Sequence, residues 1–435
     1  MEYRGEKYGR YLMHCLKNDS FVDLKNAFAN LGDSIQALAM DSIYEQIGIN
    51  QDDIQYIKRD FANEYTGTKT KIPFYSEFAR VNLSNRLPMS KDINVRMLLS
   101  AVFYDSFEEL SKIYPDCYST IKSWEPVSAR DEVTADYLNK CGVETYLTGC
   151  FTICFPKRKT TPQTPKVFFV DIPQSLEAYI PDHLKSNCEY ITHGVPIQEY
   201  PISEKENQRL EDISRSILKK YKDEATLVVT SRLHAAIPCI ALGVPVIFAC
   251  TNVDFRFAWV EKLFHPYQYE EFGQIDWNPK TIDVEDVKQK ILLMIKNALI
   301  GNSYVEEMKW LDSFYRDRER VEPYMHFHTI IREIGKLHPD NSKFKYLIWG
   351  AGFHCGYALN LMKESYPEAV PVIVVDRYKK GTVDGVAIVE PDMIPEISFD
   401  HMIITTVHGL NDALEWRDKN FPDMPYSLIT SDQKS

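Results

Sequence analysis

Short runs of β-branched and aromatic residues alternate along the chain with segments whose apolar residues recur at helical spacing. Apolar positions 35, 38, 39, 43 and 47 predict a helix that begins near Asp33. Strands are predicted at 54–58, 126–129, 166–171 and 189–192. A further helix, Glu132–Lys140, is predicted after the second of these strands and ends at Gly142. Strand, turn and helix in repeated succession predict an α/β fold with parallel sheets and crossover helices.

The clearest unit of this kind is Thr226–Phe248, with the sequence TLVVTSRLHAAIPCIALGVPVIF. It predicts a buried strand at 227–230, a helix at 234–242 and a second strand at 246–249. Gly243 provides the stop signal between the helix and the second strand.

Helices are expected on both sides of this unit, and weaker patterns occur nearer the N-terminus. Ser203 and Glu206 form a capping-box pattern that opens a helix reaching about Tyr221. Further helical patterns lie at 283–300 and within 304–336. The weaker stretches are 20–29, which favours a helix, 63–92, which is expected to be irregular, and 93–113, which fits either strand or helix.

Two polar stretches that contain proline predict linkers, at 157–165 (KRKTTPQTP) and 337–343 (LHPDNSK). They divide the chain into predicted domains at 1–165, 166–336 and 343–435. The last of these has its own pattern of elements, with strands at 345–349, 370–376 and 402–406 and helices at 357–365 and 410–420.

The chain has 435 residues, of which 44% are hydrophobic and 26% charged, so it has enough apolar material for several cores. Its formal net charge of −12 argues against general nucleic-acid binding, which needs Lys and Arg to neutralise phosphates. No apolar run is long enough to span a membrane, and the N-terminus lacks the apolar core of a signal peptide. The nine cysteines are scattered without a C-x-x-C pair, which indicates reduced thiols in a cytoplasmic protein.

The strongest candidate for chemistry is Ser231-Arg232-Leu233-His234, where a predicted strand ends and a helix begins. Ligands of parallel sheets bind at the carboxyl ends of strands, and a helix N-terminus favours an anion. Arg232 adds a forked donor for phosphate or carboxylate, and His234 exchanges a proton near neutral pH. The structural alternative is that Ser231 caps the helix and Arg232 is a solvated surface charge.

Two further junctions have the same form. In Asn30-Leu31-Gly32-Asp33 a glycine turn leads into a helix, and Asp33 is either an N-cap or a group that orients or deprotonates a sugar hydroxyl. In the second junction, 128–131, Asp131 is the expected N-cap and Arg130 is available to point into a cleft. By residue types alone, the purely structural interpretation leads at both junctions.

A glycine-rich turn, Gly350-Ala-Gly352, follows the predicted strand 345–349, and Asp376 ends the next strand. Strand, turn, helix and a later acidic residue fit a nucleotide-binding βαβ unit, although the full G-x-G-x-x-G pattern is absent. The alternative is a turn that needs glycine only for close packing.

Two other features carry less weight. His326-x-His328 has no further ligand at metal-binding spacing, so no metal site is predicted. The aromatic stretch Trp259–Phe272 is expected to pack in the core or a lid, with sugar stacking as the alternative.

Three elements together resemble the polysaccharide pyruvyl transferase family: the turn at 30–33, the junction Ser128-Ala-Arg130-Asp131-Glu132 with the sequence after it, and Thr226–Phe248. The resemblance covers about residues 20–300. It implies two Rossmann-like domains arranged as in the B-type glycosyltransferases. The last ~90 residues lie outside it and look like a small Rossmann-like module.

The resemblance implies an enzyme that moves the enolpyruvyl group of phosphoenolpyruvate onto two sugar hydroxyls, forming a cyclic ketal and releasing phosphate. Carried over by motif, His234 and Asp33 are the catalytic residues, and Arg232, Arg130, Ser231, Leu233, Asn30 and Gly32 bind substrate. The sequence departs from the family pattern in lacking a clear strand before Asn30 and in having Gly149-Cys150 where many relatives have an acidic residue.

The leading hypothesis is therefore a cytoplasmic pyruvyltransferase of exopolysaccharide or capsule biosynthesis, with at most a peripheral contact at the inner face of the membrane. Its acceptor is a sugar or a lipid-linked oligosaccharide, and no cofactor is required. The C-terminal module, through Gly350, Gly352 and Asp376, is a candidate for binding a nucleotide or nucleotide sugar. The alternatives are a nucleotide-sugar-dependent glycosyltransferase of the same architecture and a non-catalytic nucleotide-binding sensor.

Overall fold

The computed structural model describes residues 6–14, 27–73, 89–95, 110–112, 114–251, 255–316, 334, 337–338, 343–394, 398–406 and 409–429. The chain forms two compact units. One comprises Met1–Cys250 and Phe255–Arg320, and the other comprises Thr251–Asp254 and Val321–Ser435. The finer division of the first unit at 165 stays a prediction.

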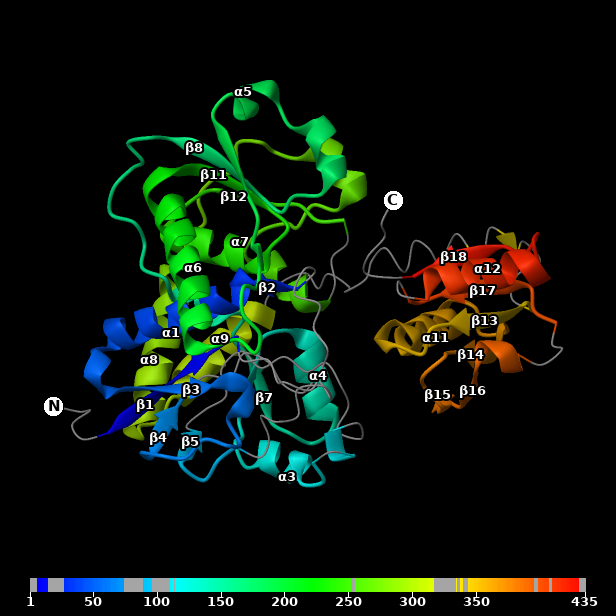
Figure 1. Ribbon diagram of the computed structural model, residues 1–435, viewed down its shortest axis with the longest axis horizontal. Coiled ribbons are helices and arrows are strands. Elements are labelled where there is room, and N and C mark those ends of the chain that lie inside the picture. Colours follow the sequence, from blue (N-terminus) through cyan, green and yellow to red (C-terminus); the bar gives the residue numbers. More distant parts are fainter. Residues whose placement is uncertain are drawn as a thin grey trace. The chain divides into compact units, whose positions relative to one another are not determined.

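The first unit contains a four-stranded parallel sheet in the order β3-β1-β4-β5 (Figure 1). Its strands are β1 Lys7–Leu12, β3 Ile54–Lys58, β4 Thr70–Ile72 and β5 Ile93–Val95. The helix α1 (Leu31–Ile47) lies between β1 and β3 in sequence and buries its apolar side, including Ile35, Leu38 and Ile43. It ends at Gly48, whose φ of 85° suits the left-handed cap that glycine provides.

A second four-stranded parallel sheet of this unit has the order β12-β11-β8-β9. Its strands are β8 Lys166–Val170, β9 Cys188–Ile191, β11 Ala225–Thr230 and β12 Val246–Phe248. The central strands are almost continuously buried, as expected for a parallel sheet that is covered on both faces. One face packs on an apolar cluster that includes Phe169, Val229 and Phe272.

Helices α6 and α7 pack against the second of these sheets, and α8 packs against α1 and α9 (Figure 1). Helices α6, α7, α8 and α9 span Glu204–Glu224, Leu233–Leu242, Glu285–Ile300 and Val305–Arg316. α1 packs against α6, α7 and α8, and α9 packs against β7 (Thr145–Leu147). Helices that follow residue 200 therefore pack directly against α1 and β7, which belong to the first 150 residues.

The first unit also contains two pairs of short strands outside the four-stranded sheets. β2 (Phe28–Asn30) pairs antiparallel with β10 (Gly194–Pro196), directly before α1. β6 (Val127–Ala129) pairs parallel with β7, and α4 (Glu132–Lys140) follows it. The remaining short elements are η1 Gln51–Asp53, η2 Arg59–Phe61, α3 Cys117–Lys122, η4 Phe151–Cys154, η5 Gln174–Tyr179, α5 Asp182–Lys185, η6 Phe255–Lys262 and η7 Tyr269–Gln274.

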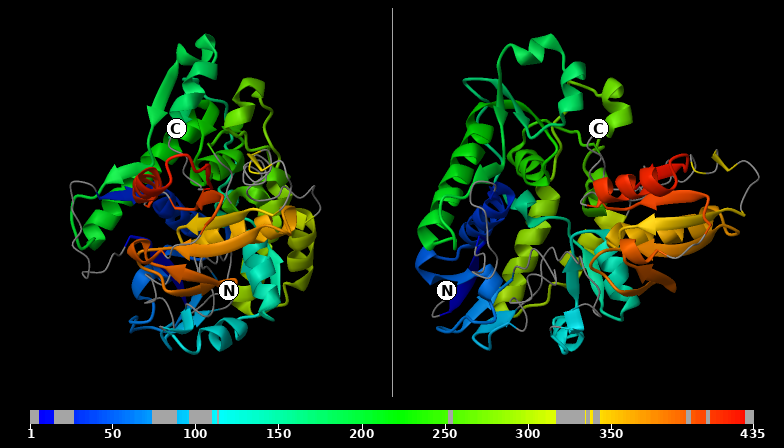
Figure 2. Two further views of the ribbon diagram at one scale, coloured as in Figure 1. Left: turned by 90° about the vertical axis from the view of Figure 1, so that its right-hand side faces the viewer. Right: turned by 45° about the vertical axis from the view of Figure 1, so that its right-hand side comes forward.

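The second unit contains a six-stranded sheet in the order β15-β16-β14-β13-β17-β18, in which only β15 is antiparallel to its neighbour. α12 packs on the sheet face that presents Leu347 and Trp349. Cys355 of α11 lies near Tyr346, whose side chain is on the alternate face. The two helices therefore cover opposite faces of this sheet (Figure 2). The bounds are β13 Lys345–Trp349, α11 Phe353–Ser365, β14 Val370–Val375, β15 Gly381–Val383, β16 Val386–Val389, η8 Pro391–Met393, β17 His401–Ile404, α12 Leu410–Asn420 and β18 Tyr426–Leu428.

The α/β class and most predicted elements are confirmed, and the strand at 54–58 and the helices at 132–140 and 410–420 match their predicted bounds. The irregular assignment of 63–92 is wrong at β4, and the helical tendency of 20–29 is wrong at Phe28–Asn30, which pairs as β2. Both strands have only three residues, and their sequences, FAN and TKI, contain no continuous apolar run. The two-domain arrangement of the B-type glycosyltransferases stays a prediction.

Candidate active site

The N-terminus of α1 is built by the first of the predicted junctions. Asn30 is the N-cap, and its side chain accepts a hydrogen bond from Gly32 N at 3.0 Å. The backbone N–H of Leu31 donates to the His193 carbonyl at 2.8 Å, which ties this turn to the β9–β10 connection. Asp33 therefore lies inside the first helical turn, and the expected alternative in which it caps the helix is wrong.

The N-terminus of α7 is built by the Ser231–His234 segment, and the helix begins at Leu233. Arg232 takes the N-cap position without a side-chain cap, and the Ser231 hydroxyl donates to the Asp171 carbonyl. Leu233 is buried. His234 is therefore the second helical residue, in the turn where free N–H groups favour an anion.

The structure brings the two helix N-termini together at His234. A Cβ atom built on Gly32 lies 2.8 Å from His234 Nδ1 and 3.2 Å from His234 Cβ, so only glycine leaves room for the imidazole. On the other side of the ring, His234 Nε2 lies 3.6 Å from Cys150 Sγ. Burial raises the pKa of the Cys150 thiol, so Cys150 faces His234 as a neutral group.

The positive charge of Arg130 acts on Cys150, because it lowers the pKa of that thiol against the larger effect of burial. The side chain is 6% exposed, and its buried Nε has no hydrogen-bond partner among the described residues. The adjacent Asp131 caps α4 by accepting from Thr134 N at 2.8 Å, as predicted. A buried guanidinium without an acceptor is costly, so its geometry fits a site that receives an anionic ligand.

Arg232, unlike Arg130, is partly exposed and paired with a carboxylate. Its Nε donates to Asp171 Oδ2 at 2.8 Å, and its side chain is 45% exposed. Burial opposes ionisation of Asp171, but hydrogen bonds from His193 N and Arg232, with the Arg232 charge, hold the pKa of Asp171 below its ordinary value. Asp171 thus orients Arg232 at the start of α7.

Asp33 belongs to a second cluster at the carboxyl ends of β1 and β3. Its Oδ1 accepts from Gln36 Nε2 at 3.3 Å and lies 3.9 Å from Nη1 of the buried Arg59, which also binds Asp60. His14 Nε2 lies 2.9 Å from Ser34 Oγ, and burial lowers the pKa of His14. The predicted acceptor residue therefore lies among charged and titratable neighbours.

Sequence reasoning missed His14, Arg59, Asp60 and the position of Cys150. Arg59 and Asp60 directly follow the correctly predicted strand 54–58, so the rule of looking at strand ends was sufficient to find them. His14 had no such signal because β1 was not predicted.

The glycine turn of the second unit forms hydrogen bonds within that unit. Asp376 Oδ2 accepts from Ala351 N at 2.8 Å, and Oδ1 accepts from Tyr378 N and Lys379 N, both at 2.9 Å. These bonds outweigh burial and lower the pKa of Asp376. Gly350 has a φ of 105° and its Cβ position lies 2.7 Å from Thr406, whereas the Cβ position of Gly352 is open. The turn at Gly350 is thus explained by packing, and nucleotide binding there stays a prediction.

No group of three His, Cys, Asp or Glu residues in the described part of the chain is placed to hold a metal ion, and His326 and His328 lie outside that part. No described helix has the length and apolarity needed to cross a bilayer. Trp259 and Phe272 are buried, in agreement with the predicted core role.

The family model for polysaccharide pyruvyl transferase matches residues 30–252, which contain Asn30, Gly32, Arg130, Arg232 and His234. No curated protein matches the chain. A crystal structure of a functionally uncharacterised protein from Klebsiella pneumoniae is 16% identical, with a TM-score of 0.33, and the match covers 57% of this chain and 84% of that one. At that score the similarity adds nothing to the functional assignment.

Proposed function

The chain belongs to the polysaccharide pyruvyl transferase family, and from this premise we propose that it transfers the enolpyruvyl group of phosphoenolpyruvate to a sugar. Two hydroxyls of the sugar form a cyclic ketal with the donor C2, and phosphate is released. The acceptor is a unit of a surface polysaccharide or of its lipid-linked precursor, and the enzyme works in the cytoplasm without a cofactor. The family assignment itself makes the protein a transferase that acts on polysaccharides.

One observation supports this reaction most: the buried Arg130, whose Nε has no hydrogen-bond partner among the described residues and whose charge acts on Cys150 beside His234 at the N-terminus of α7. Phosphoenolpyruvate carries a phosphate and a carboxylate, so it needs two anion-binding groups. A guanidinium and a helix N-terminus supply them without a metal. Arg232, oriented by Asp171, is the second guanidinium at the start of the same helix.

The proposed reaction starts with a proton delivered to the methylene carbon of the donor, which makes C2 electrophilic. The first sugar hydroxyl adds to C2 and loses its proton. The bond between C2 and the phosphate oxygen then breaks, and the second hydroxyl closes the ketal and loses its proton. Of the two protons released, one replaces the proton taken up by carbon and the other leaves with phosphate.

His234 is assigned to the proton transfer to carbon or to the departing phosphate, because it lies at the anion-favouring helix terminus. The Cys150 thiol and the Gly32 backbone fix the position of its ring. Asp33, beside Arg59, is assigned to the acceptor hydroxyls. A general acid or base of this kind typically contributes about 10²–10⁴-fold in rate.

The test is release of phosphate from phosphoenolpyruvate by the purified chain in the presence of galactosides, N-acetylmannosamine derivatives and their lipid-linked forms. We expect phosphate and a ketal product in equal amounts, also in the presence of a metal chelator. Release of a nucleotide from a nucleotide sugar, without phosphate from phosphoenolpyruvate, supports the glycosyltransferase instead. Nucleotide binding without turnover of either donor supports the sensor.

A further inference from the structure

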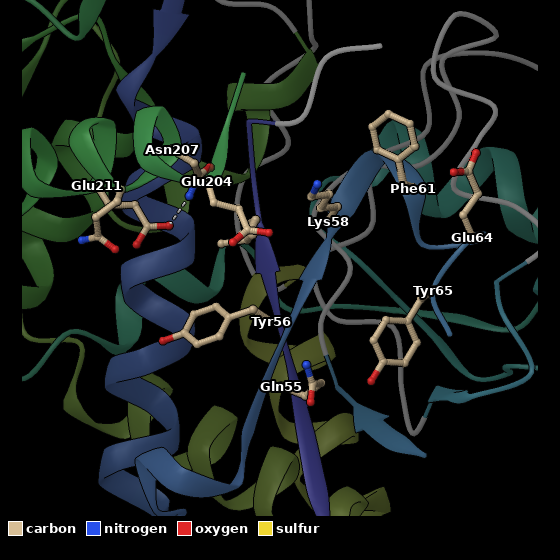
Figure 3. A pocket seen from close by; sticks show the side chains of 11 residues that line it. Gln55, Tyr56, Lys58, Phe61, Glu64, Tyr65, Glu204, Asn207 and Glu211 are labelled. Atoms are coloured by element: carbon tan, nitrogen blue, oxygen red, sulfur yellow. Dashed lines mark hydrogen bonds between the residues drawn. The ribbon is translucent and has the colours of Figure 1, made fainter. Parts of the chain in front are cut away.

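A cavity of about 710 Å³ lies beside the edge strand β3 in the first unit (Figure 3). Its volume is in the range of about 300–1,000 Å³ that ligand pockets occupy. β3 contributes Tyr56 and Lys58, the segment after it contributes Phe61, Glu64 and Tyr65, and α6 contributes carboxylates from the other side. The full lining is Leu12, Gln55, Tyr56, Lys58, Phe61, Glu64, Tyr65, Glu204, Asn207, Gln208 and Glu211.

A network of charged hydrogen bonds lies at the floor of the cavity. Arg10, which is fully buried, donates to both oxygens of Glu211 at 2.6 and 2.7 Å and to Asp41 at 2.9 Å, and its guanidinium lies 5.3 Å from the centre of the Tyr56 ring. Asn207 donates to Glu211 Oε1 at 2.8 Å. The position of the Tyr56 ring is thus supported by a buried charge network, although 46% of this residue is exposed.

Three other charged side chains line the cavity. The side chains of Lys58, Glu64 and Glu204 make no hydrogen bond or ion pair with any residue in the described ranges. Glu211 is paired with Arg10, so the charges of the described lining that have no partner there are two carboxylates and one ammonium. Aromatic faces with carboxylate acceptors suit a sugar, whose C–H face packs on a ring while its hydroxyls donate. The excess of negative charge favours a neutral unit over an anionic one.

The cavity continues the proposed acceptor region. Lys58 and Phe61 flank Arg59 and Asp60 in sequence, and Arg59 lies beside Asp33. On the other side, Asn207 Oδ1 accepts from the backbone N–H of His14 at 3.1 Å. A glycan chain that presents one unit to Asp33 therefore has a second binding surface next to it.

We propose that this cavity is an acceptor subsite that binds a neutral sugar unit adjacent to the one that is modified, and that it disfavours units carrying a carboxylate. The inference rests on the proposed function for the identity of its ligand. A unit that already carries a pyruvate ketal is anionic, so the subsite selects acceptors whose neighbouring unit is unmodified.

The test measures glycan binding by the full chain on an array that contains neutral galactose- and N-acetylmannosamine-containing tetrasaccharides and their uronic-acid counterparts. We expect neutral probes to bind about 5-fold more tightly than acidic ones, and Glu64→Gln with Glu204→Gln to reduce this preference. Tyr56→Ala should weaken neutral binding up to about 10-fold, while Tyr56→Phe retains it. Tyr378→Ala, at an exposed tyrosine of the other unit, is the matched control.

His234→Ala separates the two proposals, because it should slow transfer at least about 10²-fold and leave glycan binding unchanged. Neutral binding that depends on Tyr56, without phosphate release from phosphoenolpyruvate, refutes the proposed reaction alone. If no neutral glycan binds, or if Tyr56→Ala binds as tightly as the wild type, the subsite is refuted whether or not transfer occurs.

Discussion

Gly32 is the residue that gives the His234 imidazole its space. The position is helical and its φ is ordinary, so alanine is allowed by the backbone and is the better helix former by about 1 kcal/mol. The added Cβ would nevertheless meet Nδ1 of His234 at 2.8 Å and displace the ring. We therefore expect Gly32→Ala to lower kcat by about 10²-fold, with only a small change in thermal stability because the gain in helix propensity offsets part of the cost of the close contact.

The matched control is Gly273→Ala, where the nearest atom to the new Cβ is 3.7 Å away. Steady-state kinetics and thermal melts of the two variants give the comparison. Equal kcat values for Gly32→Ala and the wild type would mean that the position of His234 does not matter for the reaction.

Arg130 carries a different prediction, because its buried Nε has no partner among the described residues. Replacement by an apolar side chain of similar length removes the cost of that burial, so Arg130→Met should be at least as stable as the wild type. Donor binding should weaken by at least about 10-fold, and Arg130→Lys should restore it only in part because lysine lacks the fork. Thermal melts measure the stability of the variants, and the KM for phosphoenolpyruvate measures their donor binding. A much lower melting temperature of Arg130→Met with an unchanged KM would show that Arg130 stabilises the fold and does not bind the donor.

At the level of single residues, the sequence pattern selected the candidate site residues but did not predict what they contact. His234, Arg232 and Arg130 follow predicted strands, so strand-end reasoning was sufficient to select them. The proximity of Gly32, Cys150 and His234 depends on the packing of α1, α7 and η4, which lie far apart in the chain. No local pattern encodes such contacts.

Among the structural elements, the turn after β7 sets the position of Cys150. Gly149 has a φ of 62°, and its Cβ position lies 2.7 Å from both Trp259 and Tyr315. Gly142 has a similar φ of 81° but more room, with Tyr118 at 3.4 Å. Gly142→Ala should cost about 1–2 kcal/mol for backbone strain alone, and Gly149→Ala about 1–3 kcal/mol more for overpacking.

Chemical denaturation of the two variants measures this difference in the free energy of unfolding. Equal destabilisation would show that the ring contacts of Gly149 relax without cost. Reduced turnover in Gly149→Ala, measured well below its midpoint, is also expected because the turn positions Cys150 against His234.

The connection between β9 and β10 predicts a pH dependence of stability. Burial lowers the pKa of His193 to about 4, while its Nε2 lies 3.0 Å from the Tyr221 hydroxyl and its carbonyl binds Leu31. In the unfolded chain His193 binds a proton near pH 6.5, but in the folded chain it stays neutral down to about pH 4. The contribution of His193 to the free energy of unfolding is therefore complete above about pH 6.5 and is lost as the pH falls toward 4. The loss is at most about 3 kcal/mol.

Unfolding free energies of the wild type and His193→Gln between these pH values check the prediction. The variant should show a shallower decline on acidification, since its side chain does not titrate. Parallel pH profiles would mean that folding does not lower the pKa of His193.

Element prediction succeeded where a run was long and strongly patterned, as in α6 and β11, and it failed for the short strands β2 and β4, although the equally short β6 and β12 were predicted. The predicted linker 157–165 shows a further limit. Its Arg158 donates to the Ala225 carbonyl at 2.6 Å, and its backbone N–H donates to Leu242. Part of a polar, Pro-rich stretch is thus bound to β11 and α7.

For the whole molecule, the six-stranded sheet of the second unit has its own apolar core. A chain that ends near Asp340 should therefore fold and retain pyruvyl transfer, and residues 343–435 should fold alone. Circular dichroism melts of both pieces and phosphate release by the first are the measurements. Loss of transfer in a folded truncated chain would make the second unit part of the catalytic apparatus.

The most direct test of the central claim uses isotopically labelled phosphoenolpyruvate and a neutral acceptor glycan, with carbon NMR of the product. The wild type should convert the labelled C2 into a ketal carbon bonded to two sugar oxygens, with one phosphate released per ketal, and His234→Ala should do so at least about 10²-fold more slowly. A labelled carbon that never enters the glycan, or a ketal formed at the same rate by His234→Ala, would contradict the account.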